Sequence, residues 1–159
     1  MWMFFETSDN KFVNLKEVTS IAFEEYSDRY SQKRYKIIFN MSYGVSLRHD
    51  QEKIISDYVY SVYDDNQDFT ENVNYLLGLV DEYQWIKMKE PRIVNPEHIS
   101  FVTQDPRKNR IILNLAASVS FHGDSASKTS DFIYLNCSNP EEFTERLETI
   151  REQLEALIL

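Results

Sequence analysis

The chain is poor in the residues that mark several common protein classes. It has one cysteine (Cys137), three glycines and four prolines among 159 residues. A lone cysteine cannot form an internal disulfide, and few cysteines are typical of a reducing compartment. The scarcity of glycine argues against a flexible linker and against a glycine-rich phosphate-binding loop. These shortages favour a cytoplasmic protein and weigh against several classes of enzyme.

Long apolar segments are missing as well. No run approaches the roughly 18–20 apolar residues of a membrane-spanning helix. Residues 1–6 lack the basic start and the apolar stretch of a signal peptide. The sequence therefore predicts no association with a membrane.

Positive charge is also in short supply. The formal net charge is −9, and most of the acidic excess lies in the first 83 residues. An acidic surface repels nucleic acid phosphates and anionic membranes at long range. Two interpretations stay open: the charge serves solubility alone, or it selects a basic partner.

The feature that organises the sequence is an internal repeat. Shifting the chain by 74 positions places residues 36–80 over residues 110–154 without a gap, so that Phe69-Thr70-Glu71 meets Phe143-Thr144-Glu145. A new copy begins near Trp85, as the first begins near Trp2. Internal repeats indicate that one supersecondary unit has been used twice. The predicted units are residues 1–83 and 84–159.

Hydrophobic periodicity predicts the same elements in both units. Alternating patterns predict strands near residues 2–7, 12–15, 18–23, 35–41, 45–48 and 58–63, with a hairpin turn at Ser42-Tyr43-Gly44. Residues 24–34 are polar, and their middle is predicted to be a loop. Apolar residues at spacings of three and four predict helices near residues 67–82 and after a cap at Ser138 or Asn139.

The predicted class is therefore α+β with an internal tandem repeat. Each copy is an antiparallel β-meander of about 4–5 strands followed by one amphipathic helix. A unit of this size buries little surface alone. We therefore expect the copies to pack about a pseudo-two-fold axis into one globule.

Two resemblances follow from these patterns. The runs Phe4–Asp9 and Val13–Val18, followed by Ile37-Ile38, resemble small uncharacterised bacterial and phage β-meander domains, a likeness that implies no activity. The repeated order of strands and one helix is similar to Whirly- and Pur-type single-stranded nucleic acid binders. That similarity implies basic and aromatic residues on the outer sheet. A pleckstrin-homology-like barrel is a further alternative.

Catalytic and metal-binding motifs are not recognisable. The histidines His49, His98 and His122 are scattered, although His49 and His122 nearly align in the two copies beside an aspartate. A His–Asp pair suits general base catalysis, but residues of turns are the simpler explanation of these positions. No metalloprotease, hydrolase or nucleotide-binding motif is found. We expect a non-enzymatic protein with no cofactor and no metal, in which Cys137 is a half-buried residue at a strand end.

Acidic and aromatic residues gather where the last strand of the first copy meets its helix. Aspartates cap helices, but acidic groups beside aromatics also bind basic proteins or imitate a nucleic acid backbone. The first hypothesis is accordingly a protein-binding regulator or inhibitor, as a monomer or homodimer, that engages a basic protein. The predicted partner-binding residues are Asp57, Asp64, Asp65, Asp68, Glu71, Tyr58 and Tyr60.

The alternative hypothesis is a single-stranded nucleic acid binder of the Whirly or Pur plan. Such a protein needs a local basic strip despite the acidic total. The residues that could form it lie in equivalent turns of the two copies: Arg29, Lys33, Arg34, Lys36, Arg107, Lys108 and Arg110.

Overall fold

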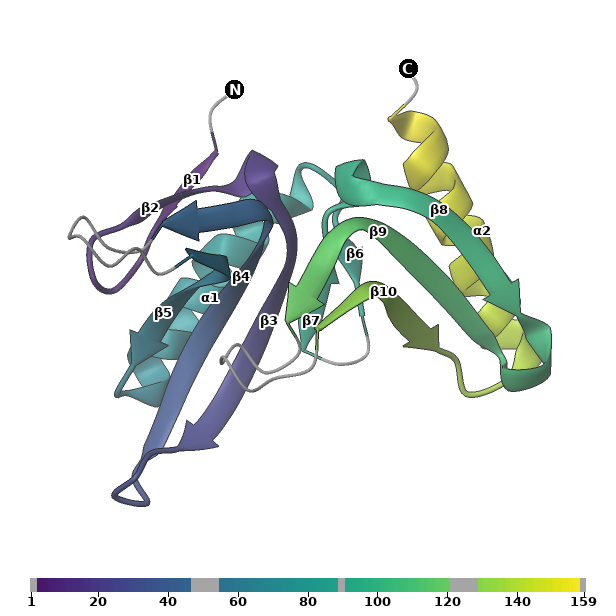
Figure 1. The fold of residues 1–159 in the computed structure, drawn as a ribbon. Coiled ribbons are helices and arrows are strands. Elements are labelled where there is room, and N and C mark those ends of the chain that lie inside the picture. Colours follow the sequence, from purple (N-terminus) through teal and green to yellow (C-terminus); the bar gives the residue numbers. More distant parts are fainter. Residues whose placement is uncertain (1–2, 47–54, 89–90, 121–128, 158–159) are drawn as a thin grey trace.

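The computed structural model describes the backbone of residues 3–46, 55–88, 91–120 and 129–157; the side chains at 43–46, 55–57, 116–120 and 129–131 lie outside the described part. It is an α+β protein with antiparallel sheets and two α-helices (Figure 1). The first half contains β1 (Phe4–Glu6), β2 (Phe12–Asn14), the 3₁₀ turn η1 (Leu15–Glu17), β3 (Val18–Ser27), β4 (Lys33–Ser46), β5 (Ile55–Tyr63) and α1 (Asn66–Asp81). The second half contains β6 (Ile86–Lys87), β7 (Arg92–Val94), η2 (Pro96–His98), β8 (Ile99–Asp105), η3 (Pro106–Lys108), β9 (Arg110–Ser120), β10 (Thr129–Asn136) and α2 (Pro140–Ala156).

The two halves share an element order and local register. Each begins with a short hairpin, continues through a 3₁₀ turn into long antiparallel strands, and ends in a helix. Phe5 pairs with Val13 in the first hairpin, and Ile86 pairs with Val94 in the second. An asparagine caps the 3₁₀ turn in both halves: Asn14 accepts from the amide of Lys16, and Asn95 accepts from that of Glu97. The second half is shorter at the β8–β9 connection.

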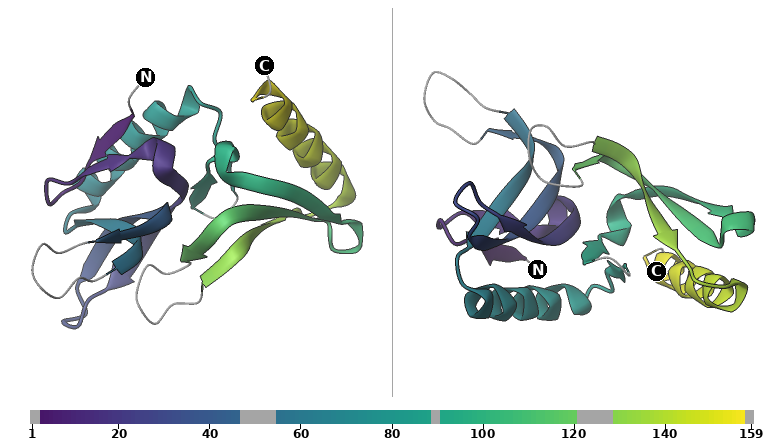
Figure 2. Two further views of the ribbon diagram at one scale, coloured as in Figure 1. Left: turned by 45° about the horizontal axis from the view of Figure 1, so that its top comes forward. Right: turned by 90° about the horizontal axis from the view of Figure 1, so that it is seen from below.

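Strand pairing joins the halves. One sheet has the strand order β5-β4-β3-β7-β6, so that β6 and β7 complete the sheet built by the first half. A second sheet has the order β10-β9-β8, and among the described strands β1 pairs only with β2. Figure 2 shows both helices on the same side of the molecule, so that none of the described helices covers the other face of either sheet. α1 contacts β4 and β5, α2 contacts β9, and β9 also contacts β3, β4 and β5.

The β6–β7 hairpin separates two hydrophobic cores and contributes side chains to both. Successive side chains of a strand point to opposite faces. Trp85 and Ile93 therefore pack in the first core, with α1, whereas Ile86 and Val94 pack in the second, with α2. The predicted boundary between residues 83 and 84 falls just before this shared hairpin. The buried members of the helix faces are Leu76, Val80, Phe143 and Ile150.

The predicted hairpin turn at Ser42-Tyr43-Gly44 is wrong. β4 continues through these residues to Ser46, with a register shift between Asn40 and Val45. A strand can absorb irregular residues in a bulge without reversing direction. Glycine at residue 44 therefore marks an irregular strand, and the connection to β5 lies in residues 47–54, outside the described part.

The loop predicted in the middle of residues 24–34 is confirmed, but β3 is longer than predicted. Glu24 pairs with Lys36 at 3.6 Å and Glu25 with Lys33 at 3.1 Å across β3 and β4. These cross-strand ion pairs let polar residues extend the ladder to Ser27. The turn is held by Asp28, whose carboxylate accepts from the amides of Tyr30 and Gln32.

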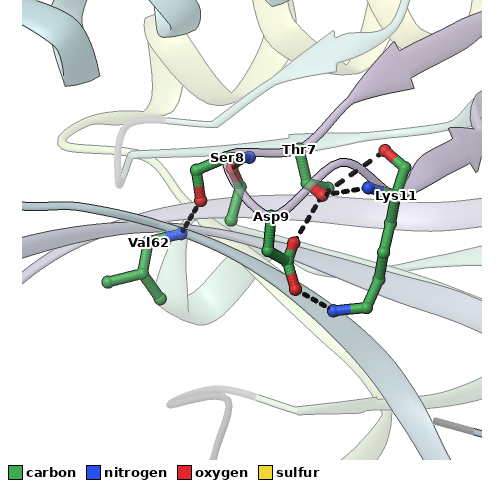
Figure 3. A network of polar contacts seen from close by, with 6 residues as sticks. Thr7, Ser8, Asp9, Lys11 and Val62 are labelled. Carbon is green, nitrogen blue, oxygen red and sulfur yellow. Dashed lines mark hydrogen bonds and ion pairs between the residues drawn. The ribbon is translucent and has the colours of Figure 1, made fainter.

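The turn of the first hairpin covers an edge of the large sheet (Figure 3). Ser8 donates its amide to the hydroxyl of Ser61 and accepts from the amide of Val62, both on β5. Buried Thr7 stabilises the turn by donating to Asp9 at 2.6 Å and accepting from the amide of Lys11 at 3.0 Å. An unpaired strand edge is a template for other chains, and this turn protects part of β5 from that pairing.

Replacing Gly78 with alanine is expected to stabilise the protein. Gly78 is an exposed residue inside α1, and an added Cβ meets no atom within 4 Å. Glycine costs a helix interior roughly 0.5–1 kcal/mol relative to alanine. The midpoint of thermal unfolding should therefore shift upward by about 1–4 °C for a chain of this size. An unchanged or lower midpoint would contradict the helical assignment at this residue.

Candidate interaction surfaces

The structure divides the predicted acidic and aromatic cluster between two faces. Asp65 is the N-cap of α1 and accepts from the amide of Gln67 at 2.8 Å, while Asp64 forms an ion pair with Arg34. Tyr58 and Tyr60 alternate with Val59, which faces α1, and so they lie on the helix-free side of the sheet. The side chain of Asp57 lies outside the described residues. The predicted residues therefore do not form one site.

A smaller acidic stripe remains on α1. Asp68, Glu71 and Tyr75 follow one another at spacings of three and four, which places them along one side of the helix. Both carboxylates are exposed, and Tyr75 is 59% exposed. Glu71 accepts a hydrogen bond from the side-chain amide of Gln67, and none of the described cations forms an ion pair with either carboxylate. We name these three residues the α1 acidic stripe.

Sequence reasoning did not include Tyr75. The signal was available, because an aromatic residue that continues the spacing of Asp68 and Glu71 must share their polar side of the helix. Tyr75 lies beside Phe5, with ring centroids 6.3 Å apart, and borders a hollow of about 550 Å³ together with Phe4 and Phe12.

The predicted basic strip is largely neutralised by neighbouring carboxylates. Arg34 pairs with Asp28 at 3.1 Å and with Asp64. The backbone amide of Gln32 and the guanidinium of Arg34 hold the pKa of Asp28 below its ordinary value. The carboxylate of Glu25 raises the pKa of Lys33. These positive charges are therefore committed to contacts within the chain.

The remaining basic residues lie apart. Arg29 packs over the ring of Tyr30 at 4.9 Å, in the β3–β4 turn. Arg107 and Lys108 are exposed in η3, the β8–β9 connection. Figure 1 shows the two connections on opposite sides of the molecule, so the two groups do not form one continuous strip.

Two matching clusters of a cation and aromatic rings lie on the helix-free faces. In the first, Lys36 lies 5.1 Å from the ring centre of Tyr60, which packs against Tyr58 at 4.8 Å. In the second, Arg110 lies 3.9 Å from the ring centre of Tyr134, which packs against Phe132 at 5.0 Å. Each cation also pairs with a carboxylate on the preceding strand: Glu24 for Lys36, and Asp105 at 3.1 Å for Arg110.

Sequence reasoning found Lys36, Tyr58, Tyr60 and Arg110, but it did not single out two aromatic neighbours, Tyr26 and Phe101. Tyr26 packs against Lys36 at 4.6 Å, and burial raises the pKa of its hydroxyl. Phe101 on β8 is 59% exposed, and it pairs with Asn114, the residue of β9 that also pairs with Phe132 of the second cluster. Cross-strand register decides these neighbours, and the sequence alone did not fix that register.

Other candidate chemistry has structural uses. The imidazole of His98 lies 2.7 Å from the carbonyl of Lys16 and so links η2 to η1. Cys137 is half-buried directly after β10, as predicted. His49 and His122 lie outside the described residues. Within the described ranges, no cluster of three or more His, Cys, Asp or Glu side chains could hold a metal ion, and neither helix has the length and apolar character needed to cross a membrane.

Comparisons of the chain with protein-family models, curated proteins and solved structures gave no match.

Proposed function

We propose that this is a cytoplasmic, non-enzymatic protein that binds a basic surface of another protein through the α1 acidic stripe. The observation that carries the proposal is that the carboxylates of the stripe lack described ion pairs, whereas most of the predicted basic residues form them. The exposed carboxylates of Asp68 and Glu71 have no described ion-pair partner, whereas Lys33, Arg34, Lys36 and Arg110 are paired. Tyr75 adds an exposed aromatic contact of the kind enriched at protein interfaces.

We infer that the two halves are tandem copies of one unit. The shared order of elements, the matching hairpin register and the asparagine caps support this inference. A pseudo-two-fold relation remains a prediction, to be tested by superposing residues 36–80 on residues 110–154 wherever both are described. In the described sheets β7 pairs with β3, while β2 has no corresponding pairing with β8.

A titration with a labelled lysine- and arginine-rich peptide tests the proposed function. Binding should be measurable at low salt and should weaken as salt rises, because exposed charges are screened. The double variant Asp68→Lys/Glu71→Lys should bind roughly tenfold more weakly or worse, since repulsion replaces attraction at two positions. The matched control is Glu145→Lys/Glu152→Lys, which makes the same change in net charge on exposed positions of α2. Equal losses in the two variants would contradict a local site.

Nucleic acid binding is the second candidate, and the clusters of cation and aromatic rings favour it. Stacking on aromatic side chains contributes about 1–3 kcal/mol per base in single-strand binders. We expect the ion pairs of Lys36 and Arg110 to prevent this use. Labelled single-stranded DNA and RNA at low salt should therefore not bind. Micromolar binding that Arg34→Ala and Arg110→Ala abolish would overturn our choice.

A further inference from the structure

The two terminal hairpins have the same register but different surroundings. Trp85 and Ile93 point from the β6–β7 hairpin into the core of the first half, where they are 5% and 3% exposed. The corresponding positions of the β1–β2 hairpin are Phe4 and Phe12, because Phe5 corresponds to Ile86 and Val13 to Val94. Phe12 is 66% exposed and Phe4 is 41% exposed. The first hairpin thus presents to solvent the side that the second hairpin buries.

The surface against which the second hairpin packs is buried in the first half, whereas the corresponding surface of the second half is partly exposed. Ile21 on β3 pairs directly with Ile93 and is fully buried, and Val80 on α1 is 1% exposed in the same core. Their counterparts in the second half are Val102 on β8 and Leu154 on α2, and both are only half-buried. These two residues line a groove of about 260 Å³ between β8 and α2, together with Gln104, Leu147, Ile150, Arg151 and Glu155.

β8 also differs from β3 in strand pairing, because one edge of β8 has no neighbouring strand in the described sheets. β3 pairs with β4 on one side and with β7 on the other. β8 pairs with β9 and, in the sheets that the structure describes, is a terminal strand. A terminal strand offers amide and carbonyl groups to an added strand. The groove and the edge of β8 together correspond to the surface on which the β6–β7 hairpin packs in the first half.

We propose that the β1–β2 hairpin of one copy docks into the β8–α2 groove of a second copy of this chain. β2 adds antiparallel to β8, with Phe12 opposite Val102 as Ile93 is opposite Ile21, and Phe12 covers the apolar groove. Figure 1 shows the β1–β2 hairpin on the opposite side of the molecule from β8 and α2, whose residues line the groove, so a second copy must supply the hairpin. The interface is head-to-tail, which produces rings or chains rather than a simple isologous dimer.

Sedimentation velocity of the full chain over a range of concentrations tests the proposal. The wild type should self-associate, and association should strengthen with salt because salt screens the net charge of −9. Phe12→Asp should weaken association by at least tenfold without affecting the fold, because the residue is exposed. The control Tyr30→Asp makes the same charge change at a residue 70% exposed in a distant turn, and it should associate like the wild type. A wild type that remains monomeric up to about 1 mM, where binding free energy is small, would overturn the proposal.

A mixing experiment tests the head-to-tail geometry. Leu154→Arg should block the groove with a long side chain. The variant should still fold, because residue 154 is half-buried near the end of α2 and the guanidinium can reach solvent. Circular dichroism checks that the variant folds, and the exposed groove residue Gln104→Asp is a second, milder variant. Phe12→Asp and Leu154→Arg should each be monomeric alone but form a capped heterodimer when mixed, since one retains the groove and the other the hairpin. Two folded variants that stay monomeric in the mixture would contradict the interface.

The salt response separates this contact from peptide binding by α1, because peptide binding weakens as salt rises.

Discussion

Replacing Trp85 with alanine is expected to lower the free energy of unfolding by about 3–5 kcal/mol, the usual penalty for emptying a buried aromatic site. The indole is 5% exposed and belongs to the core that α1 covers, although the residue lies beyond the predicted boundary at 83/84. The change therefore removes packing from the first half through a residue of the second. Urea unfolding followed by far-UV circular dichroism gives the free energy.

The control for Trp85 is Phe12→Ala in the other hairpin. Phe12 is mostly exposed, and surface substitutions usually stay within about 0.5 kcal/mol. Both variants should be measured at concentrations low enough for the chain to be monomeric. A loss below about 1 kcal/mol for Trp85→Ala, outside the range for buried aromatics, would mean that the β6–β7 hairpin does not belong to the first core.

The second large effect is expected from Asn95→Ala. The side-chain amide of Asn95 donates to the carbonyl of Val18 at 2.9 Å in a buried site, and its oxygen caps η2 by accepting from Glu97. Losing the cap costs about 0.5–2 kcal/mol, and leaving the Val18 carbonyl without its partner costs about 1–3 kcal/mol. We expect a total loss of roughly 2–4 kcal/mol in the same unfolding measurement.

Asn14 provides a matched control because it makes the same cap at η1, with Lys16 as the donor. No described hydrogen bond joins its side chain to a strand of the other half. Asn14→Ala should therefore cost only the cap, about 1 kcal/mol. Equal losses for the two asparagines would show that the contact between Asn95 and β3 contributes nothing.

Periodicity predicted most of the elements correctly. The class, the antiparallel strands and both helices followed from alternation and from three- and four-residue spacings. The turn at residues 42–44 was misplaced because glycine was given more weight than the β-favouring residues around it. A bulge inside a strand and a turn between strands have similar composition, and only the pairing partner distinguishes them.

Pairing across the halves was not accessible to local patterns. The residues of β7 do not indicate by themselves that the strand pairs with β3 rather than with β8, because either pairing would bury the same side chains of β7. The candidate site was affected in the same way. Asp64 and Arg34 are thirty positions apart in the sequence, and their ion pair follows from the β4–β5 ladder rather than from spacing.

The shared hairpin also sets an order of events during synthesis. Domains generally fold as units while the chain emerges from the ribosome, the N-terminal part first. Here the first core needs Trp85 and Ile93, so a nascent chain that ends at residue 83 has α1 but an open sheet edge at β3. The first half can reach its final packing only after residue 94 has emerged. A pause in translation before that point would expose the edge of β3 to other nascent chains.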